Sequence, residues 1–208
     1  MTSPSPLKPG VYYHIFNRGT NRENVFIEER NYRYFLQLYL KYIEPVAETF
    51  AFCLLKNHFH LLVRMKEIED LQDPKGLQRP LGSVAFSNFF NAYAKAINKA
   101  YGRTGSLFQH PFGRIPVLTQ SYLMQLVRYI HFNPQKHGLI GDFREWPWSS
   151  YHSFVQTETL KVSETFRVLT VQRDNVLSWF DDTRGFIAAH QLPIDEKVLA
   201  PLTPEDFD

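Results

Sequence analysis

The sequence KNHFHLLV, residues 56–63, indicates both the fold and the candidate site. An apolar run at residues 50–55 precedes it, and its first two residues stand near the turn that would join two strands. Side chains alternate between the two faces of a strand, so His58 and His60 point to one face and Phe59 to the other. The stretch predicts a β-hairpin whose second strand begins with two imidazoles side by side.

Two imidazoles on one face of a strand are a ready pair of metal ligands. Imidazole binds several divalent ions, and a rigid strand needs only a third ligand from elsewhere to complete a site. The alternative is a pair of half-buried histidines with ordinary hydrogen bonds, because His-x-His is short and common. A second segment bears on this choice.

That segment is a predicted helix around residues 121–133, with Ser121 as its N-cap and Pro134 at its end. Apolar residues recur at the spacing of a buried helix face: Leu123, Leu126, Val127 and Ile130. A second stripe beside it contains Tyr122, Gln125, Tyr129 and Asn133. A phenol at Tyr129 can reach a cleft there, and the amide oxygen of Asn133 can supply the third metal ligand. Alone, Tyr129 would be read as an aromatic residue packed at a helix border.

Composition limits the class of protein. The 208 residues are 44% hydrophobic, which suits one compact domain with an appendage. The single cysteine, Cys53, excludes a disulfide within the chain. Because no apolar run approaches the roughly 18 residues of a membrane span, and because residues 1–10 lack the apolar centre of a signal peptide, we expect a cytoplasmic protein with no membrane partner.

Charge is distributed unevenly along the chain. Residues 74–141 carry eight lysines and arginines and no acidic residue, whereas residues 142–208 carry six basic and twelve acidic residues. The basic window surrounds Tyr129, and a basic face of this kind is typical of polyanion binding. A solvated basic surface is the alternative. The acidic segment could dock over the basic face as an autoinhibitory cover.

The order of predicted elements is strand, helix, strand, strand, helix, strand and helix. This order predicts an α+β protein with a ferredoxin-like βαββαβ antiparallel sheet, an added C-terminal helix that carries Tyr129 and a small helical tail. The six elements before the added helix are expected at residues 11–16, 30–43, 50–55, 59–65, 83–100 and 106–118.

Together these segments resemble a known family. His58-Phe59-His60 is similar to the histidine-hydrophobic-histidine motif of the HUH endonucleases. Tyr129, with Asn133 four residues later, resembles the nucleophile helix of the single-tyrosine transposases. Segments that resemble the REP-associated tyrosine transposases in particular are YHIFNRG at 13–19, NHFH at 57–60, NPQKHGL at 133–139 and WSSY at 148–151. The resemblance covers about residues 11–151. We expect residues 1–151 to form the transposase domain and residues 152–208 to form an acidic, helical C-terminal extension.

The resemblance implies a metal-dependent endonuclease and strand transferase for single-stranded or hairpin DNA. Tyr129 would be the nucleophile of a covalent 5′-phosphotyrosine intermediate, and His58, His60 and Asn133 would hold a divalent ion, Mg²⁺ or Mn²⁺. Asn133 stands where many relatives carry glutamine. Lys136 and His131 are near enough in sequence to assist at the phosphate. The cations expected to contact DNA are Arg18, Arg22, Arg103, Arg114, Arg128 and Lys136.

Two other functions compete with this interpretation. A non-catalytic nucleic-acid-binding protein would use the same basic face and aromatic residues, with structural histidines. A metal-dependent hydrolase would use water in place of tyrosine and would leave no protein-linked DNA. The sequence is compatible with a monomer or a homodimer, and with a tyrosine helix that completes the site of its own chain or of a second copy.

Overall fold

A computed structural model describes residues 6–67, 81–155, 169–195 and 199–200 of the chain. Its four strands form one sheet in the order β2-β3-β1-β4, and every pair of neighbours is antiparallel. This is the ferredoxin-like order that the sequence predicted. The strands are β1 (Tyr12–Arg18), β2 (Ala47–Leu54), β3 (His58–Met65) and β4 (Gly113–Val117).

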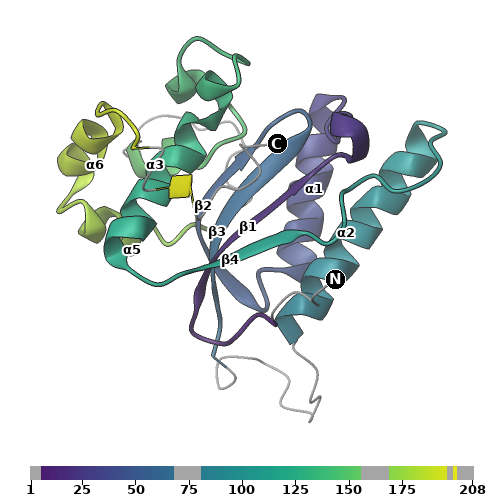
Figure 1. The fold of residues 1–208 in the computed structure, drawn as a ribbon, viewed down its shortest axis with the longest axis horizontal. Helices are drawn as coiled ribbons and strands as arrows, with labels where there is room; N and C mark the ends of the chain where they lie inside the picture. Colours follow the sequence, from purple (N-terminus) through teal and green to yellow (C-terminus); the bar gives the residue numbers. More distant parts are fainter. Residues whose placement is uncertain (1–5, 68–80, 156–168, 196–198, 201–208) are drawn as a thin grey trace.

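Helices cover both faces of the sheet (Figure 1). On one face lie α1 (Glu29–Tyr42) and α2 (Leu81–Ala100), which pack against each other. On the other face α3 (Gln120–Lys136) packs across β2 and β3. The short helices of the C-terminal part also lie on this side: α4 (Tyr151–Val155), α5 (Arg173–Trp179) and α6 (Thr183–His190).

Strand alternation separates an aromatic core from the candidate site. Phe59 is fully buried and packs against Phe35 of α1 and Phe90 of α2, at ring-centroid distances of 5.1 and 5.6 Å. Its neighbours His58 and His60 therefore lie on the opposite face of β3, toward α3. The apolar layer between the sheet and α1–α2 holds the strand rigid, and that rigidity fixes the two imidazoles.

The termini of α3 differ from those predicted. Thr119, not Ser121, is the N-cap, and its hydroxyl accepts from the Tyr122 amide at 3.3 Å. The helix continues through Pro134 to Lys136. Proline removes one helix hydrogen bond, but it lies in the last turn, and burial of Asn133 and Pro134 offsets that loss. The prediction that Pro134 ends the helix was therefore wrong, because losing one hydrogen bond in the last turn costs too little to end it.

The C-terminal part packs onto the sheet. Trp179 of α5 stacks on Phe50 with a centroid distance of 5.4 Å and an interplanar angle of 7°, and it meets the Tyr12 ring edge-on at 6.0 Å. The Gln172 amide also donates to the Thr49 carbonyl at 2.8 Å. The division at residue 151 stays a prediction, and the crossover at 68–80 and residues 156–168 lie outside the described residues. Over the part of the chain that the structure describes, no helix is both long and apolar enough to span a bilayer.

Candidate active site

His58 and His60 lie beside α3, as their place on β3 requires. Their rings meet edge-on, with centroids 5.1 Å apart and an interplanar angle of 89°. His58 is 4% exposed and His60 is fully buried. The pair is rigid and largely shielded from water.

Hydrogen bonds orient both imidazoles. His58 Nδ1 lies 2.7 Å from the amide oxygen of Asn57, whose Nδ2 donates to the Arg22 carbonyl at 3.4 Å. Because this amide oxygen only accepts, His58 Nδ1 carries the proton and Nε2 carries the lone pair. His60 Nδ1 lies 3.0 Å from His14 Nε2 on β1. When that Nδ1 donates, the Nε2 of His60 also presents a lone pair.

One stripe of α3 faces the two histidines. The Tyr129 ring meets the His60 ring edge-on at 5.4 Å, and the His137 ring, at the C-cap of the helix, meets the His58 ring at 4.9 Å. Asn133 lies midway between Tyr129 and His137, four residues from each, and so shares their helix face. The structure therefore brings Tyr129, His58, His60 and Asn133 together, as expected from the sequence.

The donor atoms of this group fit a divalent cation. Asn133 Nδ2 donates to the Tyr129 carbonyl at 3.3 Å, and its Oδ1 is buried without a hydrogen-bond partner among the described residues. A buried amide oxygen of this kind is costly unless something binds it. Within those residues, no three His, Cys, Asp or Glu side chains are grouped to hold a metal by themselves. The oxygen of Asn133 is thus the candidate third ligand of a metal bound by both histidines.

The electrostatic environment suits neutral ligands. Burial, together with the nearby His58, His14, His137 and Arg18, holds the pKa of His60 well below its usual value. Its imidazole is therefore neutral at physiological pH, which is the form that binds a metal. Lys136 brings a positive charge close to the phenol, since its Nζ lies 5.3 Å from the Tyr129 ring centroid.

A small cavity opens onto the histidine pair from the β1 side. Its volume is about 100 Å³, and its lining includes His58, His60, Arg18 and Gln109. Arg18 pairs with His58 across the strands. Tyr129 itself is only 2% exposed.

Comparisons with known proteins add to this geometry. A curated relative from Haemophilus influenzae, named "Putative REP-associated tyrosine transposase", is 29% identical over 114 residues, which are 53% of this chain and 62% of that protein. The chain thus matches less than two thirds of the relative's length. The chain resembles the REP-associated tyrosine transposases.

A solved structure has a similar fold. It is described as the "REP associates tyrosine transposase bound to a REP hairpin", and it matches 74% of this chain and 84% of that one with a TM-score of 0.53 and 20% identity. No family model matches the chain. The resemblance to REP-associated tyrosine transposases expected from the motifs is confirmed, and so is the α+β fold.

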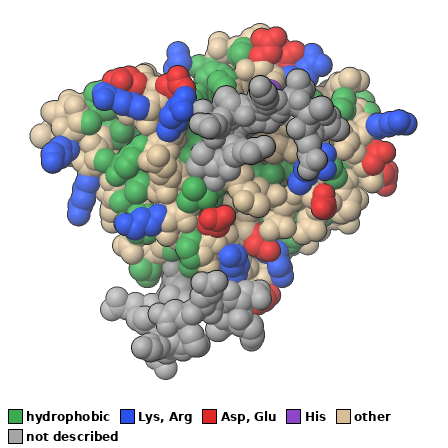
Figure 2. All heavy atoms as spheres, turned by 180° about the vertical axis from the view of Figure 1, so that it is seen from behind, with side chains coloured by type: hydrophobic (Ala, Val, Ile, Leu, Met, Phe, Trp, Pro, Cys, Tyr) green, Lys and Arg blue, Asp and Glu red, His purple; other side chains and the backbone are tan. Residues whose placement is uncertain are grey.

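The cations predicted to contact DNA have different surroundings. Arg22 is exposed beside the site, with a positive φ of 60°. Arg103 forms an ion pair with Glu23. Arg114 lies 3.8 Å from the Phe112 ring centroid and donates to the Ser83 hydroxyl at 3.1 Å. Figure 2, which views the molecule from behind, shows lysines and arginines scattered among acidic side chains on the described part of the face that it presents. Their contact with DNA stays a prediction.

Two residues of α3 have other partners. Arg128 is 6% exposed and donates to the carbonyls of Leu192 and Pro193 at 2.6 and 2.8 Å. His131 is fully buried about 200° around the helix from Tyr129, so assistance by His131 at the phosphate is excluded in this arrangement. The acidic segment lies partly outside the described residues, and its role as a cover stays a prediction.

Sequence reasoning assigned no role to three members of the site, namely His14, Asn57 and His137. The first two lie within the segments YHIFNRG and NHFH, which resemble REP-associated tyrosine transposases. His14 meets His60 because β1 pairs with β3 in a register that sets Phe16 opposite His60. His137 extends the stripe of Tyr129 and Asn133 by four residues, a spacing that could have revealed it.

Proposed function

We propose that this protein is a metal-dependent endonuclease and strand transferase that acts on single-stranded, hairpin-forming DNA in the cytoplasm through a covalent tyrosine intermediate. One observation carries the proposal: the Tyr129 ring lies edge-on to His60, on the same helix face as Asn133. The names of the relative and of the solved structure support the family and the hairpin substrate.

The proposed reaction is a phosphoryl transfer to tyrosine. Tyr129 Oη attacks a backbone phosphorus and loses its proton, while the bond from phosphorus to the 3′ oxygen breaks and that oxygen gains a proton. The products are a tyrosyl ester of the 5′ phosphate and a free 3′ hydroxyl. Because one phosphodiester replaces another, the step is reversible and a second 3′ hydroxyl can reseal the strand.

The residues of the chain prepare this step. A phenol with an ordinary pKa of about 10 is a poor nucleophile at neutral pH, and the ammonium of Lys136, which lies close to the Tyr129 ring, would stabilise negative charge that develops during the attack. His58, His60 and Asn133 would hold the divalent ion, which when bound would polarise the scissile phosphate. Mn²⁺ tolerates imidazole better than Mg²⁺ does, so we expect tighter binding of Mn²⁺.

The burial of Tyr129 favours an unpaired substrate. Reacting atoms must approach to about 3–3.5 Å in line, and a ring that is 2% exposed is reached only after neighbouring side chains shift. A flexible single strand can follow such an opening, whereas a stacked duplex cannot. Because the tyrosine and the histidines of one chain already meet, the geometry supports a site completed in cis by a monomer or by each subunit of a dimer.

The experiment that tests this proposal is covalent trapping. The protein is incubated with Mn²⁺ and a labelled library of single-stranded hairpins, and the products are separated on a denaturing gel. We expect a protein–DNA adduct that requires the metal. Tyr129→Phe and His58→Ala should abolish it, whereas Tyr122→Phe, a matched change on the same helix, should retain it.

The other outcomes identify the rival functions. Cleavage without an adduct would replace the proposal with a hydrolase that uses water. Hairpin binding without cleavage, across a library that contains a cognate site, would leave a non-catalytic DNA-binding protein.

A further inference from the structure

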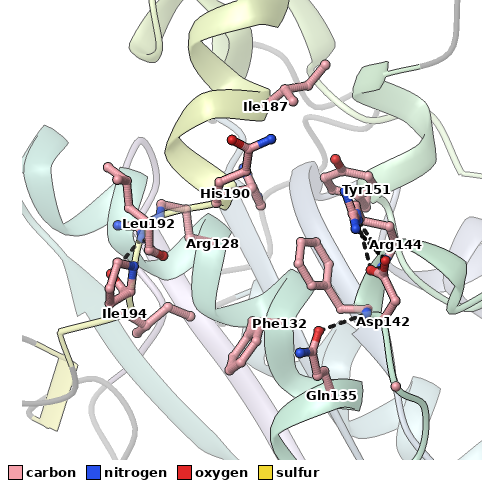
Figure 3. A pocket seen from close by; sticks show the side chains of 14 residues that line it. Arg128, Phe132, Gln135, Asp142, Arg144, Tyr151, Ile187, His190, Leu192 and Ile194 are labelled. Atoms are coloured by element: carbon pink, nitrogen blue, oxygen red, sulfur yellow. Dashed lines mark hydrogen bonds and ion pairs between the residues drawn. The ribbon is translucent and has the colours of Figure 1, made fainter.

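A second cavity lies beside α3, away from the histidine pair (Figure 3). Its volume is about 480 Å³, within the range of pockets that hold small organic ligands. One wall is α3, and the other walls come from residues 141–144, from Tyr151 and from residues 187–194 around the end of α6. The α3 wall includes Arg128, about 100° around the helix from Tyr129. The lining of this cavity shares no residue with the small cavity at the histidine pair, so the two are distinct.

Among the residues that the structure describes, Arg128 is a buried cation with no acidic partner. It is 6% exposed, and its guanidinium donates only to neutral groups: the Gln125 side chain at 2.8 Å and the carbonyls of Leu192 and Pro193. Its Nε is buried and has no hydrogen-bond partner among the described residues. Burying an arginine without an acidic partner is costly. An anion in the cavity would supply the missing charge.

The other charges of the lining leave this cation uncompensated. Asp142 lies in the wall but is engaged by Arg144, with an Nη2 to Oδ2 distance of 2.5 Å and a second contact from Nε at 2.8 Å. The pair is neutral as a unit. With His190 neutral in its hydrogen-bond network, the lining carries one net positive charge, which suits a ligand with one anionic group.

The remaining walls favour a flat, apolar body. Phe132 and Phe143 meet edge-on at 5.9 Å, and Tyr151 meets Phe143 edge-on at 5.2 Å. Ile187 of α6 lies on the opposite side of the cavity in Figure 3. Aromatic side chains next to an arginine form the combination on which a base and its phosphate bind.

We propose that this cavity binds one nucleotide, with its phosphate beside Arg128 and its base against Phe132 and Phe143. Other aromatic anions would fit the same walls, and we choose a nucleotide because the proposed function is a reaction on DNA. The nucleotide is either free or one unpaired nucleotide of a bound strand, and the chemistry of recognition is the same. Occupation would link a ligand to α3, the helix that carries Tyr129.

Calorimetry on the full chain in EDTA tests the proposal without any cleavage. The probes are the four deoxynucleoside 5′-monophosphates, the matching deoxynucleosides and inorganic phosphate, followed by a short single-stranded oligonucleotide. We expect at least one monophosphate to bind at least tenfold more tightly than its nucleoside and than phosphate. If only the oligonucleotide binds, and the variants described below weaken its binding, the cavity takes one unpaired nucleotide of a bound strand and not a free nucleotide.

Two variants locate the site. Arg128→Gln removes the charge, and Ile187→Trp fills the cavity while keeping Arg128 and its carbonyl partners. Each should weaken binding at least tenfold, whereas Arg184→Gln, which removes an exposed charge from the same helix as Ile187, should not. Binding unchanged in Ile187→Trp, or no binding by any probe at millimolar concentration, would overturn the proposal. Since EDTA prevents the metal-dependent reaction, failure here leaves the adduct result unaffected.

Discussion

His131 donates a hydrogen bond from Nδ1 to Nε2 of His190 over 2.9 Å. The direction of this bond follows from the other nitrogen of His190. His190 Nδ1 lies 2.8 Å from the Phe186 carbonyl oxygen, which can only accept, so Nδ1 donates. In neutral His190 the Nε2 then accepts, so His131 donates, and His131 Nε2 accepts from the Ser150 hydroxyl at 2.8 Å. The network joins α3 to α6 and to the start of α4, and it requires both imidazoles to be neutral.

This network predicts acid sensitivity. Burial lowers the pKa of His190 from 6.5 to about 4, and burial also holds the pKa of His131 well below its usual value. In the unfolded chain His190 is protonated as the pH falls below 6.5, whereas in the folded chain it stays neutral until about pH 4. The free energy of unfolding therefore falls as the pH falls through this range. For His190 alone the loss between pH 7.5 and 5 is about 2 kcal/mol.

Urea unfolding at the two pH values measures this loss. His190→Gln should reduce the dependence of the unfolding free energy on pH, whereas His110→Gln, at an exposed position, should leave it unchanged. An equal pH dependence in both variants would contradict the assignment.

The hydrogen bond from His58 to Asn57 predicts an effect on metal affinity. Without the amide oxygen, His58 loses the partner that fixes its tautomer and ring orientation. Asn57→Ala should weaken Mn²⁺ binding roughly 10–100-fold, measured by calorimetry, with the thermal midpoint of the apo protein nearly unchanged. Asn24→Ala, at an exposed position, is the control. Wild-type affinity in Asn57→Ala would exclude the orienting role.

Arg22 predicts a change in salt dependence. Its side chain is exposed beside the site, and its carbonyl accepts from Asn57. If it neutralises one phosphate, Arg22→Gln should lower the slope of log K against log salt by about 0.7 for a single strand. Filter binding at several salt concentrations measures the slope, with Arg33→Gln on α1 as the control. An unchanged slope would remove Arg22 from the DNA interface.

Trp179 predicts how strongly the C-terminal part stabilises the fold. Replacing it with alanine removes the stacking on Phe50 and the edge contact with Tyr12. Trp179→Ala should lower the unfolding free energy by about 2–3 kcal/mol, and Leu118→Ala, at a side chain that is 78% exposed, should hardly change it. Two separate unfolding transitions in the wild type would instead favour an independent extension after residue 151.

Local patterns predicted the parts of the site that lie within one element. Alternation on a strand placed His58 and His60 together, and the helix repeat aligned Tyr129 with Asn133. The family resemblance also pointed to these two pairs of residues as the site. The resemblance implied a shared site, but their contact depends on α3 packing across β2 and β3, which only the structure shows.

Contacts between distant segments were beyond local reasoning. The bond between His14 and His60 depends on strand register, and the pairing of His131 with His190 joins residues 59 positions apart. Arg128 illustrates the same limit. Its charge and its place in an acid-free window predicted contact with DNA, which stays a prediction. Composition could not show that its guanidinium donates to Gln125 and to the carbonyls of Leu192 and Pro193.

Pro134 has a mechanical consequence for α3. Because proline has no amide hydrogen, the last turn is joined to the rest of the helix by one bond fewer. Tyr129 lies before this weak point, and Lys136 and His137 lie after it. We therefore expect the end of α3 to open at a lower free energy than the part that packs across β2 and β3, so the amides after Pro134 should exchange hydrogen faster than those around Tyr129.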